Sequence, residues 1–369
     1  MSIFSSLFGS IFKKDESVLG IDIGSSAIKV VQIRKKRGKA VLETYGELSL
    51  GPYAGTDIGR STNLPPDKIA QALKDLFTES KKFTATNSGL ALPLSSSLIS
   101  FITIPPVSPD KVKEVVSLEA RKYIPVPLDE VMMDFSPIPR EDDYVTDEDT
   151  KVDSSVRDFL VVAIHKQYLT DFQSIVTNAH INAGFFEIEI FSSIRSVIDR
   201  GVHTDMIIDM GARSTKLYII ERGVLRASHI INKGSQDITL AISKAMSIPV
   251  SEAERLKRSH GLKGGPEYKE LTEIITVNLD YIFYEANATL LNYQKKYSKN
   301  IKTVILTGGG VLLRGFVDLA RIGFQTEVIY ADPFGKLETP AFLAEEFAKA
   351  GPEFAVAIGV AIRRLNEVG

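Results

Sequence analysis

Two short stretches of this chain, LGIDIGSSAIK at residues 19–29 and IIDMGARSTK at residues 207–216, have the same order of residue types. Each begins as an apolar run typical of a buried strand, carries an aspartate, turns at a glycine followed by small residues, and returns along a second strand. Aligning the two aspartates also superposes the glycines and lysines that follow them. The equivalent pairs are Asp22 with Asp209, Gly24 with Gly211, and Lys29 with Lys216.

The first of these hairpins has the composition of a phosphate-binding turn. Gly24 and the small residues Ser25 and Ser26 allow backbone N–H groups to approach an anion. Asp22 would face a magnesium ion through water, because magnesium usually retains several of its waters. Lys29 returns on the partner strand close to the same phosphates. Taken alone, the stretch is equally typical of an ordinary hairpin with a glycine turn.

The second hairpin favours the phosphate interpretation. One hairpin from each of two lobes can grip the β- and γ-phosphates of a nucleotide from opposite sides. In the second, Gly211 and Ala212 would approach the phosphates, Thr215 would donate its hydroxyl, and Asp209 would face the metal. The repeat therefore predicts a clamp for ATP and Mg²⁺.

Two further motifs follow in the order that such a clamp needs. The strand VILT at residues 304–307 ends in Gly308, Gly309 and Gly310, where the missing side chains would let a flat base and ribose lie against the backbone. Glu254 and Lys257, three residues apart on one helix face, could reach the ribose hydroxyls and the base. Separately, these motifs are also typical of a strand-to-helix turn and of a solvated ion pair.

The composition is that of an ordinary soluble protein with more than one subdomain. The 369 residues are 44% hydrophobic and 24% charged with a net charge of −2, which argues against disorder and against nucleic acid as a partner. The absence of cysteine excludes disulfides, a thiolate nucleophile and Cys-ligated zinc. No apolar run reaches the roughly 18 residues of a membrane span, and no P-loop, zinc-protease or serine-hydrolase motif occurs.

Strands that alternate with helices predict an α/β fold of two lobes with an insert. The insert is expected to read strand, helix, strand, strand, with its helix at 108–123, and a closing helix is expected at 353–366. The predicted division is a flexible or amphipathic tail at 1–17, a first lobe at 18–93 plus 165–200 and 352–369, an inserted subdomain at 94–164, and a second lobe at 201–351.

Two segments are not explained by the nucleotide site. Residues 3–12 place apolar side chains at helical spacing before Lys13 and Lys14, which suits a membrane surface or a partner groove, or packing on the chain's own lobe. The lysines follow the apolar stretch, so we do not expect an export signal. Residues 141–155 hold seven acidic residues and one lysine, and we expect a solvated loop there because the spacing of a calcium loop is missing.

The motifs together resemble the actin, Hsp70 and sugar-kinase superfamily. More closely, the chain is similar to the FtsA and PilM branch of bacterial actin-like proteins, and best to the PilM family of type IV pilus assembly. The resemblance runs from Val18 to the end, through EARKYIP at 119–125, AERLK at 253–257 and FAVAIG at 354–359. It implies an actin-like, ribonuclease H-like two-lobed fold in which 94–164 is the relocated 1C subdomain, with 1A as the first lobe and 2A and 2B as the second.

The resemblance also implies partners and a place in the cell. These are the N-terminal cytoplasmic tail of a PilN-like membrane protein, docked in a groove beside the 1C subdomain, and components of the pilus motor. The expected location is cytoplasmic, peripheral to the inner membrane, at a pilus or a related type II secretion platform. Any ATPase activity should be slow, with Glu189 as the candidate for positioning water. Gly234 is expected to approach the nucleotide, although it follows Lys233 at a place where the family often has two glycines.

Two other functions remain open at this stage. An FtsA-like, filament-forming division protein would be favoured by an amphipathic helix at the C-terminus, where we expect none after the closing helix. A small-molecule kinase of the same superfamily would need a substrate-binding aspartate or its equivalent in the cleft. Self-association is left open by the sequence.

Overall fold

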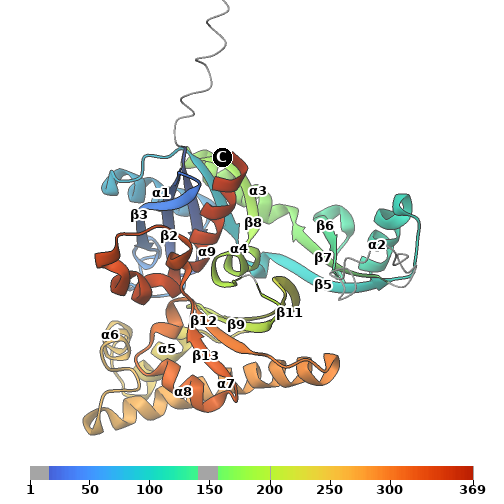
Figure 1. Ribbon diagram of the computed structural model, residues 1–369. Helices are drawn as coiled ribbons and strands as arrows, with labels where there is room; N and C mark the ends of the chain where they lie inside the picture. The colour runs from blue at the N-terminus through green and yellow to red at the C-terminus, as the bar shows by residue number, and fades with distance from the viewer. Residues whose placement is uncertain (1–15, 140–156, 200, 369) are drawn as a thin grey trace, which may run out of the picture. The chain divides into compact units, whose positions relative to one another are not determined.

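The computed structural model describes residues 16–139, 157–199 and 201–368 (Figure 1). It divides into two compact units, Met1–Leu92 with Ile175–Gly369, and Pro93–Ser174. The apolar stretch near the N-terminus and the acidic segment at 141–155 lie outside the described residues. The larger unit contains two five-stranded sheets and the smaller unit one three-stranded sheet.

The first sheet has the strand order β3-β2-β1-β4-β8. Its first three strands form the antiparallel meander expected from the sequence, and β4 and β8 then add in parallel. In the register of β1 and β2, Asp22 is the cross-strand partner of Lys29. The strands are β1 Ser17–Ile23, β2 Ala27–Lys36, β3 Lys39–Ser49, β4 Asn87–Leu92 and β8 Asn182–Ile188.

The second sheet repeats this topology strand for strand, in the order β11-β10-β9-β12-β13. Again three strands are antiparallel and two more add in parallel, and Asp209 is the cross-strand partner of Lys216. The repeated hairpin in the sequence therefore reflects a repeated five-stranded sheet. The strands are β9 Thr204–Met210, β10 Thr215–Glu221, β11 Val224–Ile231, β12 Thr303–Thr307 and β13 Glu327–Tyr330.

Helices bury the apolar faces of both sheets. Around the first sheet lie α1 Pro66–Ser80, α4 Glu189–Val197 and α9 Ala344–Val368, with α9 packed on β1, β2 and β4. The second sheet carries α5 Ser235–Ala245, α6 Val250–His260, α7 Lys269–Tyr297 and α8 Phe316–Gly323. In Figure 1, α7 is the long orange helix that runs along this sheet. Its inner face contributes to the largest core of the molecule.

The closing helix is longer than the sequence indicated. We expected it to begin at Glu353, but α9 begins at Ala344 and continues through Pro352. The carbonyl of Pro352 accepts hydrogen bonds from the Gly308 backbone N–H (2.8 Å) and from the Thr307 hydroxyl (2.7 Å). The end of β12 in the second sheet is thereby tied to a helix that packs on the first.

The smaller unit is a three-stranded antiparallel sheet covered by a short helix. Its order is β5-β7-β6, and α2 packs on β5. All four elements expected for the insert are present, although α2 is shorter than the predicted helix at 108–123 because a 3₁₀ turn precedes it. The bounds are β5 Ser97–Ile104, α2 Val112–Ala120, β6 Val131–Pro137 and β7 Arg157–His165, followed by α3 Lys166–Asn178. None of the described helices is both long and apolar enough for a membrane span.

Candidate functional site

The two glycine turns close in the same way. The Gly24 N–H donates to the Ala27 carbonyl, and the Gly211 N–H donates to the Ser214 carbonyl, each at 3.0 Å. Each bond closes a turn of four residues, so the two residues between donor and acceptor form the tip of the hairpin. These are Ser25 and Ser26 in the first turn, and Ala212 and Arg213 in the second. The predicted equivalence of the two hairpins therefore extends to their hydrogen bonding.

Hydrogen bonds through one residue, Thr62, connect the two turns. Thr62, between β3 and α1, donates to the Ser25 carbonyl from its backbone N–H (2.7 Å) and from its hydroxyl (3.0 Å). Arg213 Nη2, from the tip of the second turn, donates to the Thr62 carbonyl at 2.7 Å. This link was not predicted, although Arg213 stands inside the repeated motif, because Thr62 lies in a polar loop without a recognisable pattern.

The strands that lead into and out of the two turns carry charged side chains that interact with one another. Burial raises the pKa of Asp22 to about 7, against the opposing effect of Lys29. On the other hairpin, Lys216 Nζ lies 3.5 Å from Asp209 Oδ2. Burial alone would lower the pKa of Lys216, but the carboxylates of Glu189 and Asp209 raise it above its usual value. Asp22 also feels the charges of Glu189, Lys216 and Asp209, so both predicted metal-facing aspartates belong to one electrostatic cluster.

Glu189, expected to position water, is held in an ion pair. Its Oε2 lies 2.6 Å from Lys216 Nζ, and only 6% of the residue is exposed. It stands in the first turn of α4, where the helix dipole also favours a carboxylate. In this structure its role is to hold Lys216.

Lys29 has a partner that the sequence did not suggest. Its Nζ lies 3.9 Å from Glu353 Oε2 on α9. The same Glu353 oxygen would lie 3.2 Å from a Cβ at Gly309. Glu353 thus connects the first hairpin with the three-glycine turn, and burial raises its pKa.

Thr215, whose hydroxyl is expected to meet a phosphate, makes a hydrogen bond within the second lobe's own backbone. The residue is fully buried, and its hydroxyl donates to the Lys233 carbonyl at 2.8 Å. This bond fixes the segment that leads into α5. The backbone N–H groups of Ser235 and Gln236 in turn donate to the Gly211 and Ala212 carbonyls, each at 3.0 Å.

Gly234 is needed for that close approach. A Cβ at this position would lie 2.4 Å from the Ala212 carbonyl oxygen, so no larger residue fits without moving the second turn. The Gly234 N–H donates to Asp237 Oδ2 at 2.8 Å. The single glycine after Lys233 therefore brings the start of α5 against the second turn.

The three glycines after β12 differ from one another. Gly308 has φ of +85°, and a Cβ there would lie 2.5 Å from Asp209 Oδ1. At Gly310 a Cβ would meet the Met210 side chain at the same distance. These two glycines are therefore required by packing against the end of β9. Gly309, whose nearest neighbour is the Glu353 carboxylate, is the one whose missing side chain leaves room beside the cluster.

Glu254 and Lys257 form a buried ion pair at 2.7 Å, not a solvated one. Lys257 also donates to Thr239 Oγ1 (2.8 Å) and to the Ser235 carbonyl (3.1 Å). Burial alone would raise the pKa of Glu254, but Lys257 and its other donors lower it. The pair belongs to α6 and contacts the start of α5 through the Ser235 carbonyl.

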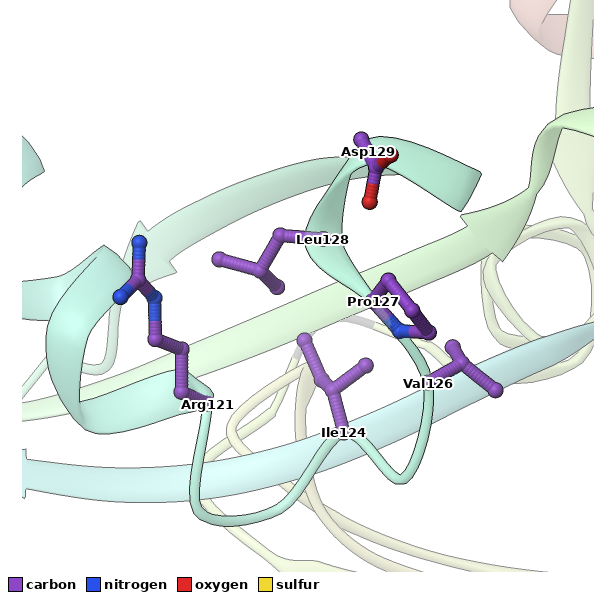
Figure 2. A pocket seen from close by; sticks show the side chains of 6 residues that line it. All are labelled: Arg121, Ile124, Val126, Pro127, Leu128 and Asp129. Atoms are coloured by element: carbon purple, nitrogen blue, oxygen red, sulfur yellow. The ribbon is translucent and has the colours of Figure 1, made fainter.

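A separate cavity of about 560 Å³ lies in the smaller unit. It is formed by the second half of the EARKYIP motif and the turn that follows it, and Figure 2 shows Ile124 and Leu128 in the middle with Arg121 to one side. Its lining residues are Arg121, Ile124, Val126, Pro127, Leu128 and Asp129.

Known proteins resemble this chain over most of its length. FtsA of Agrobacterium fabrum is 25% identical over 230 residues, covering 56% of this chain and 51% of that protein, so the chain spans about half the length of this relative. FtsA of Streptococcus pneumoniae is 24% identical and covers 88% and 77%.

Solved structures show the same fold. A PilM–PilN type IV pilus biogenesis complex superposes with a TM-score of 0.78 at 22% identity, covering 94% of this chain and 98% of that one. MreB5 of Spiroplasma citri bound to ADP superposes with a TM-score of 0.54 at 14% identity, covering 96% and 99%. The fold is therefore that of the actin-like ATPases. The family described as type IV pilus assembly protein PilM matches residues 20–365, and the chain belongs to this family.

Proposed function

We propose that this protein is an ATP-binding scaffold on the cytoplasmic side of an inner-membrane platform that assembles type IV pili, or of a related type II secretion platform. Membership of the PilM family supports the pilus role. The observation that supports nucleotide binding is the hydrogen-bonded link from Ser25 through Thr62 to Arg213, which connects the two glycine turns. We further propose the lobe division given above, with 94–164 as the 1C subdomain.

The residues present fit Mg²⁺ and a triphosphate. Burial raises the pKa of the Asp22 carboxylate even though Lys29 lies nearby, and a divalent ion would add positive charge that favours its ionised form. We propose that Asp22 and Asp209 face Mg²⁺ and that Gly24, Ser25, Ser26, Gly211 and Ala212 approach the phosphates through backbone N–H groups. Lys29 and Lys216 would supply positive charge. When bound, the ion would neutralise the phosphate oxygens.

The base and ribose would lie between Gly309 and the Glu254–Lys257 pair. Gly308, next to Gly309, packs against Met210 beside the second turn. Lys257 contacts the start of α5, which in turn is hydrogen-bonded to the second turn. Glu254 would accept from a ribose hydroxyl, since its carboxylate is kept ionised by Lys257. Because Glu189 is engaged by Lys216, we propose at most slow hydrolysis.

We propose the N-terminal cytoplasmic tail of a PilN-like membrane protein as the partner. A PilM–PilN complex has the same fold as this chain. The cavity in the smaller unit has an apolar floor of Ile124, Val126 and Leu128, with Arg121 and Asp129 at its edges. That lining suits one apolar anchor of an extended peptide flanked by polar groups. Through this tail the protein would be peripheral to the inner membrane and would couple to components of the pilus motor.

Calorimetric titration with a synthetic tail peptide, with and without Mg-ATP, tests this function. We expect saturable binding that weakens by about tenfold or more in a Leu128→Ser variant. Leu118→Ser, which changes an exposed leucine on the neighbouring helix, is the matched control and should bind as the unchanged protein does. No binding in either nucleotide condition would contradict the proposal.

An FtsA-like role is the second candidate, because FtsA of Streptococcus pneumoniae matches along 88% of this chain. Such a protein would form ATP-dependent filaments on membranes. Negative-stain microscopy of the protein on anionic lipid vesicles with Mg-ATP distinguishes the two. Filaments together with failure to bind the tail peptide would favour the division role.

A further inference from the structure

The long helix α7 has an apolar stripe on the face turned away from the core. Its inner face is buried in the second lobe. On the outer face Val277 is 70% exposed, Tyr281 50%, Tyr284 70% and Leu291 59%. The half-buried Ile274, which also packs against the core at the edge of the stripe, and the half-buried Ala288 continue the series, so that apolar residues recur at spacings of three and four, which is the repeat of a coiled-coil seam. We call these six residues the outer seam: Ile274, Val277, Tyr281, Tyr284, Ala288 and Leu291.

The outer seam is unusual for a surface helix. Scattered exposed apolar residues need no explanation, but a continuous stripe marks an interaction site. From Ile274 to Leu291 the seam is about 25 Å long at a helical rise of about 1.5 Å per residue. Two central tyrosines offer large, rigid contact area, as binding hot spots do. The stripe therefore has the length and composition for pairing with another helix.

The charges at the ends of the seam favour α7 of a second copy, in antiparallel orientation, as the helix that pairs with it. Glu270 and Lys295 are exposed and continue the same repeat, one step beyond each end. A parallel, in-register pair of α7 helices would place glutamate against glutamate and lysine against lysine. In an antiparallel pair with Tyr281 opposite Tyr284 of the second copy, every seam position faces an apolar residue and both ends close with opposite charges. The facing layers are Glu270 with Lys295, Ile274 with Leu291, Val277 with Ala288, and Tyr281 with Tyr284.

The acidic residues on either side of the seam also favour antiparallel pairing. Asp280 and Glu285 stand on opposite sides of the stripe, in the positions that face each other across a parallel pair. Parallel pairing would thus bring two acidic side chains together. In antiparallel pairing each flank faces the equivalent flank of the other helix, so Asp280 and Glu285 are kept apart.

We propose that two copies of this protein associate through the outer seams of their α7 helices, antiparallel and about a two-fold axis between Tyr281 and Tyr284. The interface is isologous and closes as a dimer. It involves no residue of the nucleotide cluster or of the cavity in the smaller unit, so it is separable from the proposed function.

Sedimentation velocity of the full chain over a range of concentrations tests the association. We expect a monomer–dimer equilibrium whose dissociation constant rises by at least about tenfold in Tyr284→Ser. Ile322→Ser on α8 makes a similar apolar-to-polar change at an 82% exposed position off the seam and should leave the equilibrium unchanged. A monomer at all concentrations, or an equal effect of both variants, would overturn the proposal.

Charge exchange tests the direction of pairing. Glu270→Lys and Lys295→Glu should each weaken the dimer, because each creates a like-charge pair at both ends, and the double variant should restore it.

Since the chain has no cysteine, disulfide formation gives a second test of the direction of pairing. A mixture of Val277→Cys and Ala288→Cys proteins should cross-link on mild oxidation, whereas Val277→Cys alone should not. Efficient cross-linking of Val277→Cys with itself would show parallel pairing and refute the arrangement.

Discussion

Lys216 Nζ lies 2.6 Å from Glu189 Oε2, so the second glycine hairpin is ion-paired to the helix that follows the last strand of the first sheet. Lys216 reaches Asp209 on its other side at 3.5 Å. One lysine therefore joins the start of α4 to the predicted metal-facing aspartate of the other lobe. A carboxylate engaged in this way is poorly placed to act as a base.

We predict that Glu189→Gln mainly affects stability and nucleotide affinity. Removing one partner of a buried pair leaves Lys216 less compensated, which should lower the free energy of unfolding by about 1–3 kcal/mol. Chemical denaturation measures this. Glu345→Gln, which breaks an exposed pair with Lys349, is the control and should leave the free energy of unfolding nearly unchanged. Unchanged stability and affinity with abolished hydrolysis would instead support a catalytic role for Glu189.

Asp22→Asn should stabilise the nucleotide-free protein while removing its response to Mg-ATP. The carboxylate is costly in the free protein because burial opposes its charge, as its raised pKa shows. An amide of the same shape avoids that cost, so we expect unfolding at pH 8 to require about 1 kcal/mol more. Thermal unfolding with and without Mg-ATP provides both readouts. A destabilised variant that still responds to nucleotide would argue against the metal-facing role.

Alanine substitutions at Gly308 and Gly309 should have different effects, one on stability and the other on nucleotide binding. Gly308→Ala is expected to destabilise the fold by about 2 kcal/mol or more, since φ is +85° and the new Cβ would meet Asp209. Gly309→Ala should fold but bind nucleotide more weakly. Gly323→Ala, at the end of α8, has open space around its Cβ and is the control. Tight nucleotide binding by Gly309→Ala would remove this residue from the base site.

Glu187 holds a buried network that should make stability fall in acid. It accepts hydrogen bonds from Arg195 (2.7 Å), Arg363 (2.9 Å) and Ser192 (2.6 Å). Burial alone would raise its pKa, but the two arginines and Ser192 lower it below the usual value of 4.5. The stabilisation is therefore complete above about pH 5 and is lost as the pH falls through the folded-state pKa.

Glu187→Gln should thus cost about 3 kcal/mol at pH 7 and much less near pH 3. Denaturant unfolding of both proteins at the two pH values measures the difference. A penalty that is the same at both pH values would mean that the charge of Glu187 contributes nothing.

Local patterns predicted the parts of the site that lie within one hairpin. Apolar alternation and glycine turns predicted β1 with β2 and β9 with β10, and placed Lys29 on the strand that pairs with that of Asp22. The repeated order of motifs then predicted the actin-like fold. These features depend on short-range chain geometry, which a sequence displays directly.

Contacts between distant segments could not be predicted in this way. Thr62 and Arg213 are 151 residues apart, and nothing local marks either as a partner. The strand β13 is only four residues long, and its apolar run of three residues is too short to indicate a strand, so it was not predicted. The early start of α9 was missed because Gly351 and Pro352 suggest a break, whereas packing on the first sheet carries the helix through them.

The central claim is that opposing hairpins grip the β- and γ-phosphates, and calorimetric titration of the protein with ATP, ADP and AMP in Mg²⁺ tests it most directly. We predict that ATP binds at least about a hundredfold more tightly than AMP, and that Lys29→Ala in one hairpin and Lys216→Ala in the other each reduce the difference. Equal affinities for ATP and AMP, or the absence of nucleotide binding, would contradict the account.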